Sequence, residues 1–190
     1  MRVATVPNAI SVVRVVLAPV FLWLYVTGDT DAALATFAAA AATDVLDGLA
    51  ARLLQQRTRF GAYLDAAADK LLMACGLVAL AWQGQLPWWL PALVVGRDAL
   101  LSVGAAVLVV TGNPLELAPT RLGKYATALL AATVVVAMLA EFGGLAPGRA
   151  APWVAALGLL AALHVVLSAI QYAFYFIRGA RAGQREPPWD

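Results

Sequence analysis

Long runs of hydrophobic residues, broken by short polar or turn-forming clusters, fill most of this 190-residue chain. Each run is close to the roughly 20 residues that a helix needs to cross the hydrocarbon core of a bilayer. The breaks contain glycine, proline, asparagine or charged residues, which are typical of helix ends and turns. The pattern predicts six membrane-spanning helices, over residues 9–27, 31–52, 61–83, 86–110, 121–141 and 151–177.

The composition also indicates an all-α integral membrane protein. Hydrophobic residues make up 63% of the chain and charged residues 13%, whereas soluble domains have about half and about a quarter. Six spans leave no room for a separate soluble domain, so we expect one six-span domain over 1–178 and a cytoplasmic tail over 179–190. A single cysteine and a single histidine exclude an internal disulfide and a multi-histidine metal centre. The net charge of +2 gives no indication of nucleic-acid binding.

The positions of lysine and arginine predict how the helices are oriented, because basic residues gather on the cytoplasmic side of a membrane. Nine of them fall at the N-terminus, in or beside the second and fourth connections, and in the tail: Arg2, Arg52, Arg57, Arg59, Arg121, Lys124, Arg178, Arg181 and Arg185. Only Arg149 falls on the other side. We therefore expect both termini to be cytoplasmic, in a plasma membrane or a bacterial-type inner membrane.

The informative ionisable residues inside the predicted spans are Arg14, Asp44, Asp47, Asp65, Asp69, Lys70, Arg97 and Asp98. A charged residue at a lipid-facing helix centre costs about 2.5–3.5 kcal/mol, so these side chains are expected to face a polar interior. One interpretation is a structural network that pairs the acids with Arg14, Lys70 and Arg97. The other is a functional site.

The spacing of four aspartates favours a functional site. Asp44 and Asp47 are three residues apart, and Asp65 and Asp69 are four apart, so each pair shares one helical face. The two helices are antiparallel and joined by a short connection, which places the pairs at matching depths. Carboxylates without histidine or cysteine select hard divalent cations, so we expect two Mg²⁺ or Mn²⁺ ions, with Ca²⁺ as a possible substitute.

The residues around these aspartates form a recognisable motif, Asp44-x-x-Asp47-Gly48-x-x-Ala51-Arg52, eight residues, then Gly61-x-x-x-Asp65-x-x-x-Asp69. It closely resembles the signature of the CDP-alcohol phosphotransferases, which are membrane enzymes of phospholipid synthesis. All eight fixed positions match. The opening segment, residues 7–14, and the six-span architecture with cytoplasmic termini are also similar to the family.

The resemblance implies transfer of a substituted phosphoryl group from a CDP-linked lipid to an alcohol, with release of CMP. It implies that Asp44, Asp47, Asp65 and Asp69 hold two Mg²⁺ or Mn²⁺ ions and that Asp69 is the catalytic base. It further implies a nucleotide pocket formed by four other signature residues, Gly48, Ala51, Arg52 and Gly61. An active site that faces the cytoplasm and a homodimer are expected from the family.

Three basic residues are candidates for binding the alcohol acceptor: Arg97, Arg121 and Lys124. Basic side chains bind phosphate groups, so these residues suggest a phosphorylated alcohol as the acceptor. For Arg121 and Lys124, the alternative is that they only anchor the helix on the cytoplasmic side of the membrane. Residues 119–127 are similar to a stretch in the phosphatidylglycerophosphate synthases and the related cardiolipin synthases. The expected donor is CDP-diacylglycerol, and the expected acceptor is glycerol 3-phosphate. Phosphatidylglycerol is the alternative, because the pair Arg97-Asp98 is closer to the cardiolipin enzymes. The reaction of another CDP-alcohol phosphotransferase is a further alternative.

A function of a different class is also compatible with buried carboxylates in a helical membrane protein, namely a cation transporter. The motif argues against it, since a transporter has no need of Gly48, Ala51, Arg52 and Gly61 at these spacings. CMP release separates the two hypotheses, because only an enzyme requires a CDP-lipid.

Overall fold

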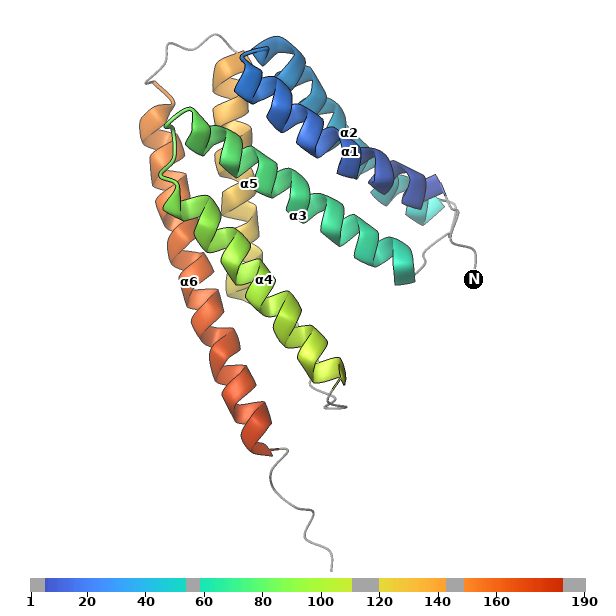
Figure 1. Ribbon diagram of the computed structural model, residues 1–190, viewed down its shortest axis with the longest axis vertical. Helices are drawn as coiled ribbons and strands as arrows, with labels where there is room; N and C mark the ends of the chain where they lie inside the picture. Colours follow the sequence, from blue (N-terminus) through green and yellow to red (C-terminus); the bar gives the residue numbers. More distant parts are fainter. Residues whose placement is uncertain (1–5, 54–58, 111–119, 143–148, 183–190) are drawn as a thin grey trace, which may run out of the picture.

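The computed structural model describes residues 6–53, 59–110, 120–142 and 149–182, and these form six α-helices (Figure 1). In chain order they are α1 (Val6–Thr27), α2 (Thr30–Leu53), α3 (Arg59–Trp82), α4 (Trp89–Val110), α5 (Arg121–Phe142) and α6 (Ala151–Ala182). The prediction of an all-helical protein with six long helices is confirmed.

The helix ends agree with the predicted ranges to within two residues except at three places. α1 begins at Val6 rather than at residue 9. α4 begins at Trp89 rather than at residue 86, because Leu86 and Pro87 belong to the preceding turn. α6 continues to Ala182, since the polar residues that end a hydrophobic span do not end the helical backbone. Within the described residues, three helical segments are long and apolar enough to cross a membrane: Asn8–Thr27, Arg121–Glu141 and Ala151–Phe174.

The helices form two groups that meet at one end and diverge toward the other (Figure 1). In the first group, α1 packs against both α2 and α3. In the second group, α6 packs against α5 and also contacts α4. Contacts of α3 with α4 and α5 join the two groups. α3, which carries Asp65 and Asp69, therefore lies between the two groups.

Tight turns connect α1 to α2 and α3 to α4 at the end where the groups meet. Gly28 and Gly84 follow the last residues of α1 and α3 with φ of 91° and 76°, a left-handed conformation that favours glycine. After α1, the amide of Gly28 donates to the carbonyl of Tyr25 and the amide of Asp29 to that of Leu24. The Asp29 carboxylate then accepts from the amide of Ala32 and caps α2. The sequence therefore encodes these two helical hairpins locally.

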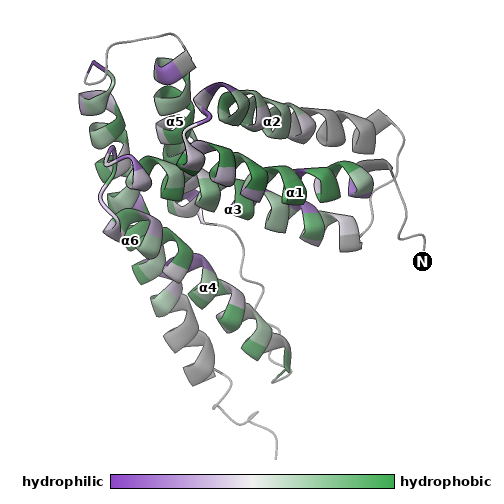
Figure 2. Ribbon diagram, turned by 45° about the horizontal axis from the view of Figure 1, so that its top comes forward, coloured by the Kyte–Doolittle hydropathy of each residue, from purple (hydrophilic) through white to green (hydrophobic). Residues whose placement is uncertain are grey.

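Hydrophobic residues cover the outward surfaces of the helices as well as their contacts (Figure 2). Phe21, Leu77, Leu80 and Val154 are fully buried in the core. Many large apolar side chains are exposed, including Trp23 at 64% and Leu139 at 62%. Soluble monomers rarely expose contiguous apolar surface on this scale. The surface agrees with the expected lipid environment.

A polar cluster ties three elements together at the end where the groups meet. The hydroxyl of Tyr25 in α1 donates to Glu141 Oε1 in α5 at 2.7 Å. Gln85, in the connection between α3 and α4, donates from Nε2 to the same oxygen at 2.9 Å. Tyr25 is only 2% exposed, so both bonds lie in a largely dry environment, where they hold α1, α5 and the connection in register.

Replacing Tyr25 with phenylalanine is expected to lower the free energy of unfolding by about 1.5–3 kcal/mol, the usual value of a hydrogen bond to a charged group. The measurement is the unfolding midpoint of the purified protein in detergent. Tyr63→Phe is the control, because Tyr63 is 78% exposed. Equal midpoints for the two variants would show that the bond to Glu141 adds nothing to stability.

Candidate active site

Arg14 lies at the centre of a cluster formed by the first three helices, which we call the carboxylate cluster: Arg14, Thr43, Asp65 and Asp69. Nη1 of Arg14 donates to Asp65 Oδ1 at 3.1 Å and to Asp69 Oδ1. Its Nε donates to the hydroxyl of Thr43 at 3.4 Å. One guanidinium from α1 thus joins the carboxylates of α3 to the residue of α2 that precedes Asp44.

Burial differs sharply across this cluster. The Arg14 side chain is fully buried, whereas those of Asp65 and Asp69 are 43% and 52% exposed. The carboxylates therefore keep oxygen atoms open to an approaching ligand while Arg14 holds them from the protein side. Two carboxylate oxygens within reach of one nitrogen also lie close to one another, as the oxygen ligands of a divalent cation do.

The other signature residues lie near the facing ends of α2 and α3. Asp44, Asp47, Gly48, Ala51 and Arg52 fall in the last three turns of α2, and their side chains lie outside the part of the chain that the structure describes. Gly61 is half-buried in the first turn of α3. Of the four carboxylates predicted to lie together, the structure therefore describes the side chains of Asp65 and Asp69 alone. Among the described residues, no group of three or more potential ligands assembles.

A second cluster surrounds Arg97 where α4, the start of α5 and α6 meet, and we call it the Arg97 cluster: Arg97, Asp98, Thr120, Gly123, Ser168 and Tyr172. Nη1 of Arg97 donates to Asp98 Oδ1 at 2.7 Å, and Nη2 donates to Ser168 Oγ at 2.8 Å. The Arg97 side chain is 14% exposed. Its Nε is buried without a hydrogen-bond partner within the described residues.

Tyr172 supports both Arg97 and the start of α5. Its ring centroid lies 5.9 Å from Cζ of Arg97, a cation–π distance. Its hydroxyl accepts a hydrogen bond from the amide of Thr120 at 3.2 Å. The hydroxyl of Thr120 in turn accepts from the amide of Gly123 at 3.1 Å and caps α5. Arg121 and Lys124 lie exposed in the first turn of this helix, so one tyrosine holds the helix that carries them beside Arg97.

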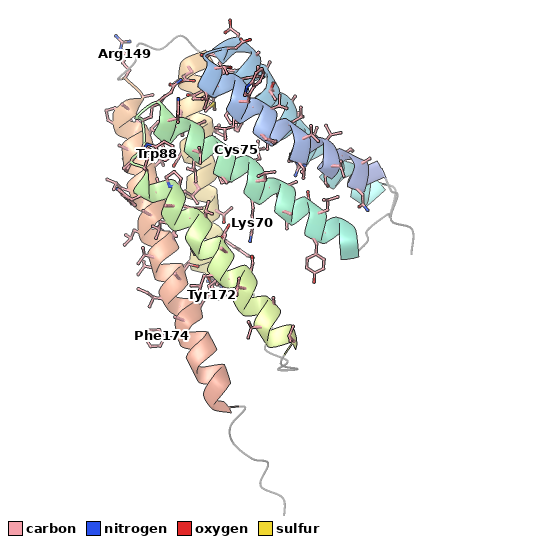
Figure 3. The ribbon with its side chains drawn as sticks, viewed as in Figure 1. Lys70, Cys75, Trp88, Arg149, Tyr172 and Phe174 are labelled. Atoms are coloured by element: carbon pink, nitrogen blue, oxygen red, sulfur yellow. The ribbon has the colours of Figure 1, made fainter. Side chains whose placement is uncertain are left out.

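Lys70 connects the two clusters. It follows Asp69 directly in α3, on the side of the helix toward α4 (Figure 3), and its Nζ lies 3.9 Å from Asp98 Oδ2. The Lys70 side chain is 51% exposed, so this ion pair is weak in energy. It shows nonetheless that the carboxylate cluster and the Arg97 cluster are neighbours along one polar region of the bundle.

The pairing network considered from the sequence is present. Each of the three basic residues considered for this network, Arg14, Lys70 and Arg97, contacts an aspartate. The network does not exclude a functional site, because Asp65 and Asp69 stay half-exposed while they pair with Arg14. Pairing lowers the cost of keeping these carboxylates within the bundle, and exposure leaves them available.

Several residues of both clusters were not among the predicted site residues. Arg14 was recognised only as a charge to be balanced, and Thr43, Thr120, Ser168 and Tyr172 were absent. The sequence signal that could have identified them is the presence of polar residues within apolar helices. Ser168 and Tyr172, for example, are four residues apart in α6 and share one face. Sequence spacing does not show which helix that face contacts.

Fold and site together define an all-helical protein with apolar helices of membrane-spanning length and a polar interior of aspartates and basic residues. The sequence profile of the CDP-alcohol phosphatidyltransferase family matches residues 4–174. The chain therefore belongs to this family, which confirms the resemblance found in the motif.

Two curated relatives show how far the similarity extends. A CDP-diacylglycerol–glycerol-3-phosphate 3-phosphatidyltransferase of Pseudomonas fluorescens is 47% identical over 102 residues, which are 51% of this chain and 52% of that protein. A cardiolipin synthase (CMP-forming) of Streptomyces coelicolor is 37% identical over 119 residues, 60% of this chain and 55% of that protein. The chain thus spans about half the length of these relatives.

Proposed function

We propose that this protein acts in phospholipid biosynthesis, transferring a phosphatidyl group from CDP-diacylglycerol to a hydroxyl of glycerol 3-phosphate and releasing CMP. The observation that carries the proposal is the convergence of Asp65 and Asp69 on buried Arg14, within the family signature. The relative of 47% identity, whose name states this reaction, supports glycerol 3-phosphate as the acceptor. The new bond forms between the acceptor oxygen and the phosphorus that carries diacylglycerol, and the bond to the CMP phosphate breaks.

The chain's own residues are assigned to four tasks in this proposal. Asp69 accepts the proton of the attacking hydroxyl, and Arg14 holds Asp69 and Asp65 in place. Gly48, Ala51, Arg52 and Gly61 contact the nucleotide. Arg97, Arg121 and Lys124 bind the phosphate of the acceptor, which matches their common location at α4 and the start of α5.

The donor set suits two divalent ions, Mg²⁺ or Mn²⁺. Asp44, Asp47, Asp65 and Asp69 are hard oxygen ligands, and the two whose side chains are described present half-exposed carboxylates to the same region. Bound there, the ions would neutralise charge on the diphosphate and on the departing CMP.

The proposed topology has all six helices crossing the membrane as one domain over 1–178, with a tail over 179–190. Both termini and the active site face the cytoplasm, as the bias of lysine and arginine supports. A homodimer in a plasma or bacterial-type inner membrane is part of the proposal. The three long apolar segments of α1, α5 and α6 support the membrane location.

The test is CMP release by the purified protein from CDP-diacylglycerol with Mn²⁺, comparing glycerol 3-phosphate, phosphatidylglycerol and serine as acceptors. We expect release with glycerol 3-phosphate, its loss on chelation of the metal, and its recovery when Mn²⁺ is restored. Release that survives chelation would contradict the metal assignment. No release with any acceptor would contradict transfer from CDP-diacylglycerol to these alcohols and would favour another CDP-alcohol phosphotransferase reaction.

A cardiolipin synthase-type reaction is the second candidate. The Streptomyces relative and the adjacent pair Arg97-Asp98, joined by a 2.7 Å hydrogen bond, favour it. In the same assay, release with phosphatidylglycerol and none with glycerol 3-phosphate would establish this candidate in place of the first.

A further inference from the structure

The guanidinium of Arg97 is held in one orientation by residues of two helices, α4 and α6. Asp98 of α4 accepts from Nη1, Ser168 of α6 accepts from Nη2, and the ring of Tyr172, also of α6, lies against the cation. An arginine side chain has many rotamers, so a guanidinium held on two nitrogens and against a ring is strongly restricted. Ser168 lies outside the family signature and the predicted site, and Gly123 lies in the stretch 119–127 but was given no role there.

Gly123 is where the start of α5 comes closest to this guanidinium. A Cβ at this position would lie 3.0 Å from Nη2 of Arg97, 3.2 Å from the hydroxyl of Thr120 and 3.3 Å from that of Ser168. All three contacts are tighter than ordinary van der Waals packing. A side chain at position 123 would therefore require the end of Arg97, or the hydroxyls that surround it, to shift by a few tenths of an ångström.

We propose that Ser168 and Gly123 are positioning residues that fix the Arg97 guanidinium for an anionic phosphate oxygen of the acceptor. This rests on the proposed function and names the residues that set its acceptor affinity. Ser168 holds Nη2 from α6, and the missing side chain of Gly123 leaves the space that Nη2 occupies.

The remaining N–H groups of Arg97 point to the same role. A guanidinium carries five N–H donors, and the structure gives acceptors to Nη1 and Nη2. Nε is buried without an acceptor among the described residues, and such a donor is unfavourable until an acceptor reaches it. An arginine held for purely structural reasons would be expected to have this donor satisfied.

Charge distinguishes this cluster from the carboxylate cluster. Asp98 balances Arg97 and is also approached by Lys70, while Arg121 and Lys124 add positive charge in the first turn of α5. The helix start contributes a partial positive charge as well. The Arg97 cluster is thus the cationic part of the polar region, and the carboxylate cluster is the part suited to metal ions.

The experiment compares Ser168→Ala and Gly123→Ala with two matched controls. Ser102→Ala removes an exposed hydroxyl of α4 that bonds only to its own helix. Gly96→Ala places a methyl group next to Arg97 in the chain, where nothing lies within 4 Å. Both controls reproduce the chemical change without touching the guanidinium.

Two readouts are needed: equilibrium binding of glycerol 3-phosphate to the purified protein, and the acceptor and donor KM values for CMP release. We expect each test variant to weaken glycerol 3-phosphate binding and raise the acceptor KM by about tenfold, the effect of one lost hydrogen bond to a charged group. The donor KM should stay unchanged, and the controls should stay within about twofold of the unmodified protein. Phosphatidylglycerol as acceptor tests whether the phosphate of a lipid is bound in the same way.

Failure of this proposal can be told from failure of the proposed function. If the unmodified protein releases no CMP but binds glycerol 3-phosphate, and the two test variants bind it more weakly, the positioning role stands without the transferase. Equal binding by the test variants and the controls would overturn the positioning role, as would the absence of binding to the unmodified protein. Equal rises in the donor and acceptor KM values would also overturn it, because they indicate a general disturbance of the fold.

Discussion

Replacing Asp69 with asparagine is expected to reduce CMP release from CDP-diacylglycerol by at least about 100-fold, the lower end of what a general base contributes. Asparagine has nearly the same shape and accepts a hydrogen bond from Arg14 through its amide oxygen, so the geometry of the carboxylate cluster should survive. It does not accept a proton from the attacking hydroxyl. The measurement is the initial rate of CMP release at saturating Mn²⁺.

Two further observations make this expectation specific to Asp69. Asp31→Asn is the control, because Asp31 is exposed in the first turn of α2, at the opposite end of that helix from Asp44 and Asp47. Donor binding by Asp69→Asn should remain measurable, and its unfolding midpoint should fall only slightly, because Asp65 still pairs with Arg14. A variant that regains full turnover at high Mn²⁺ would show that Asp69 acts as a metal ligand alone and that another group takes the proton.

Replacing Arg14 with methionine is expected to reduce both stability and turnover. The substitution removes two charged hydrogen bonds to aspartates and leaves two neighbouring carboxylates that repel each other. Losing one partner of a fully buried ion pair costs about 3–5 kcal/mol, but Asp65 and Asp69 are half-exposed and water can solvate them. We therefore expect a loss of about 2–3 kcal/mol in the free energy of unfolding, and a fall in CMP release of about tenfold or more.

A second variant separates charge from geometry at this position. Arg14→Lys keeps the positive charge but lacks the planar fork that contacts Thr43 and both aspartates. It should recover part of the lost stability while turnover stays low. Arg149→Met, which removes an exposed arginine outside both clusters, is the control for loss of charge alone. If Arg14→Met had the same unfolding temperature as the unmodified protein, the ion pairs of Arg14 with Asp65 and Asp69 would not stabilise the fold.

The helices were predictable because the information that defines them is local. Hydrophobic runs gave α1 and α5 to within three residues at each end, and Gly28 and Gly84 mark the tight turns through their left-handed conformation. The start of α4 was misplaced because Leu86 is hydrophobic but lies in a turn. Periodicity and hydropathy describe side chains, whereas a helix end is set by the backbone.

The candidate site was predictable only in part. The shared face of Asp65 and Asp69 follows from their spacing of four residues, and the structure places both on one nitrogen of Arg14. The spacing did not show that Arg14 supplies that nitrogen. Arg14 is 51 residues from Asp65 in the chain, and its partner depends on how α1 packs against α3. The bond between Arg97 and Ser168, 71 residues apart, was hidden for the same reason.

The bonds of Tyr25 and Gln85 to Glu141 have a mechanical consequence for a protein whose proposed donor is a lipid with two acyl chains. They lie where the two groups of helices meet, so a rotation that separates the diverging parts of the groups, the arms, would have its pivot near these bonds (Figure 1). α3 has 24 residues, a length of about 36 Å, so a rotation of about 5° at the pivot displaces its far end by about 3 Å. The same rotation moves the pivot atoms very little. Lateral entry of a bulky lipid between the arms would therefore leave the bonds to Glu141 intact.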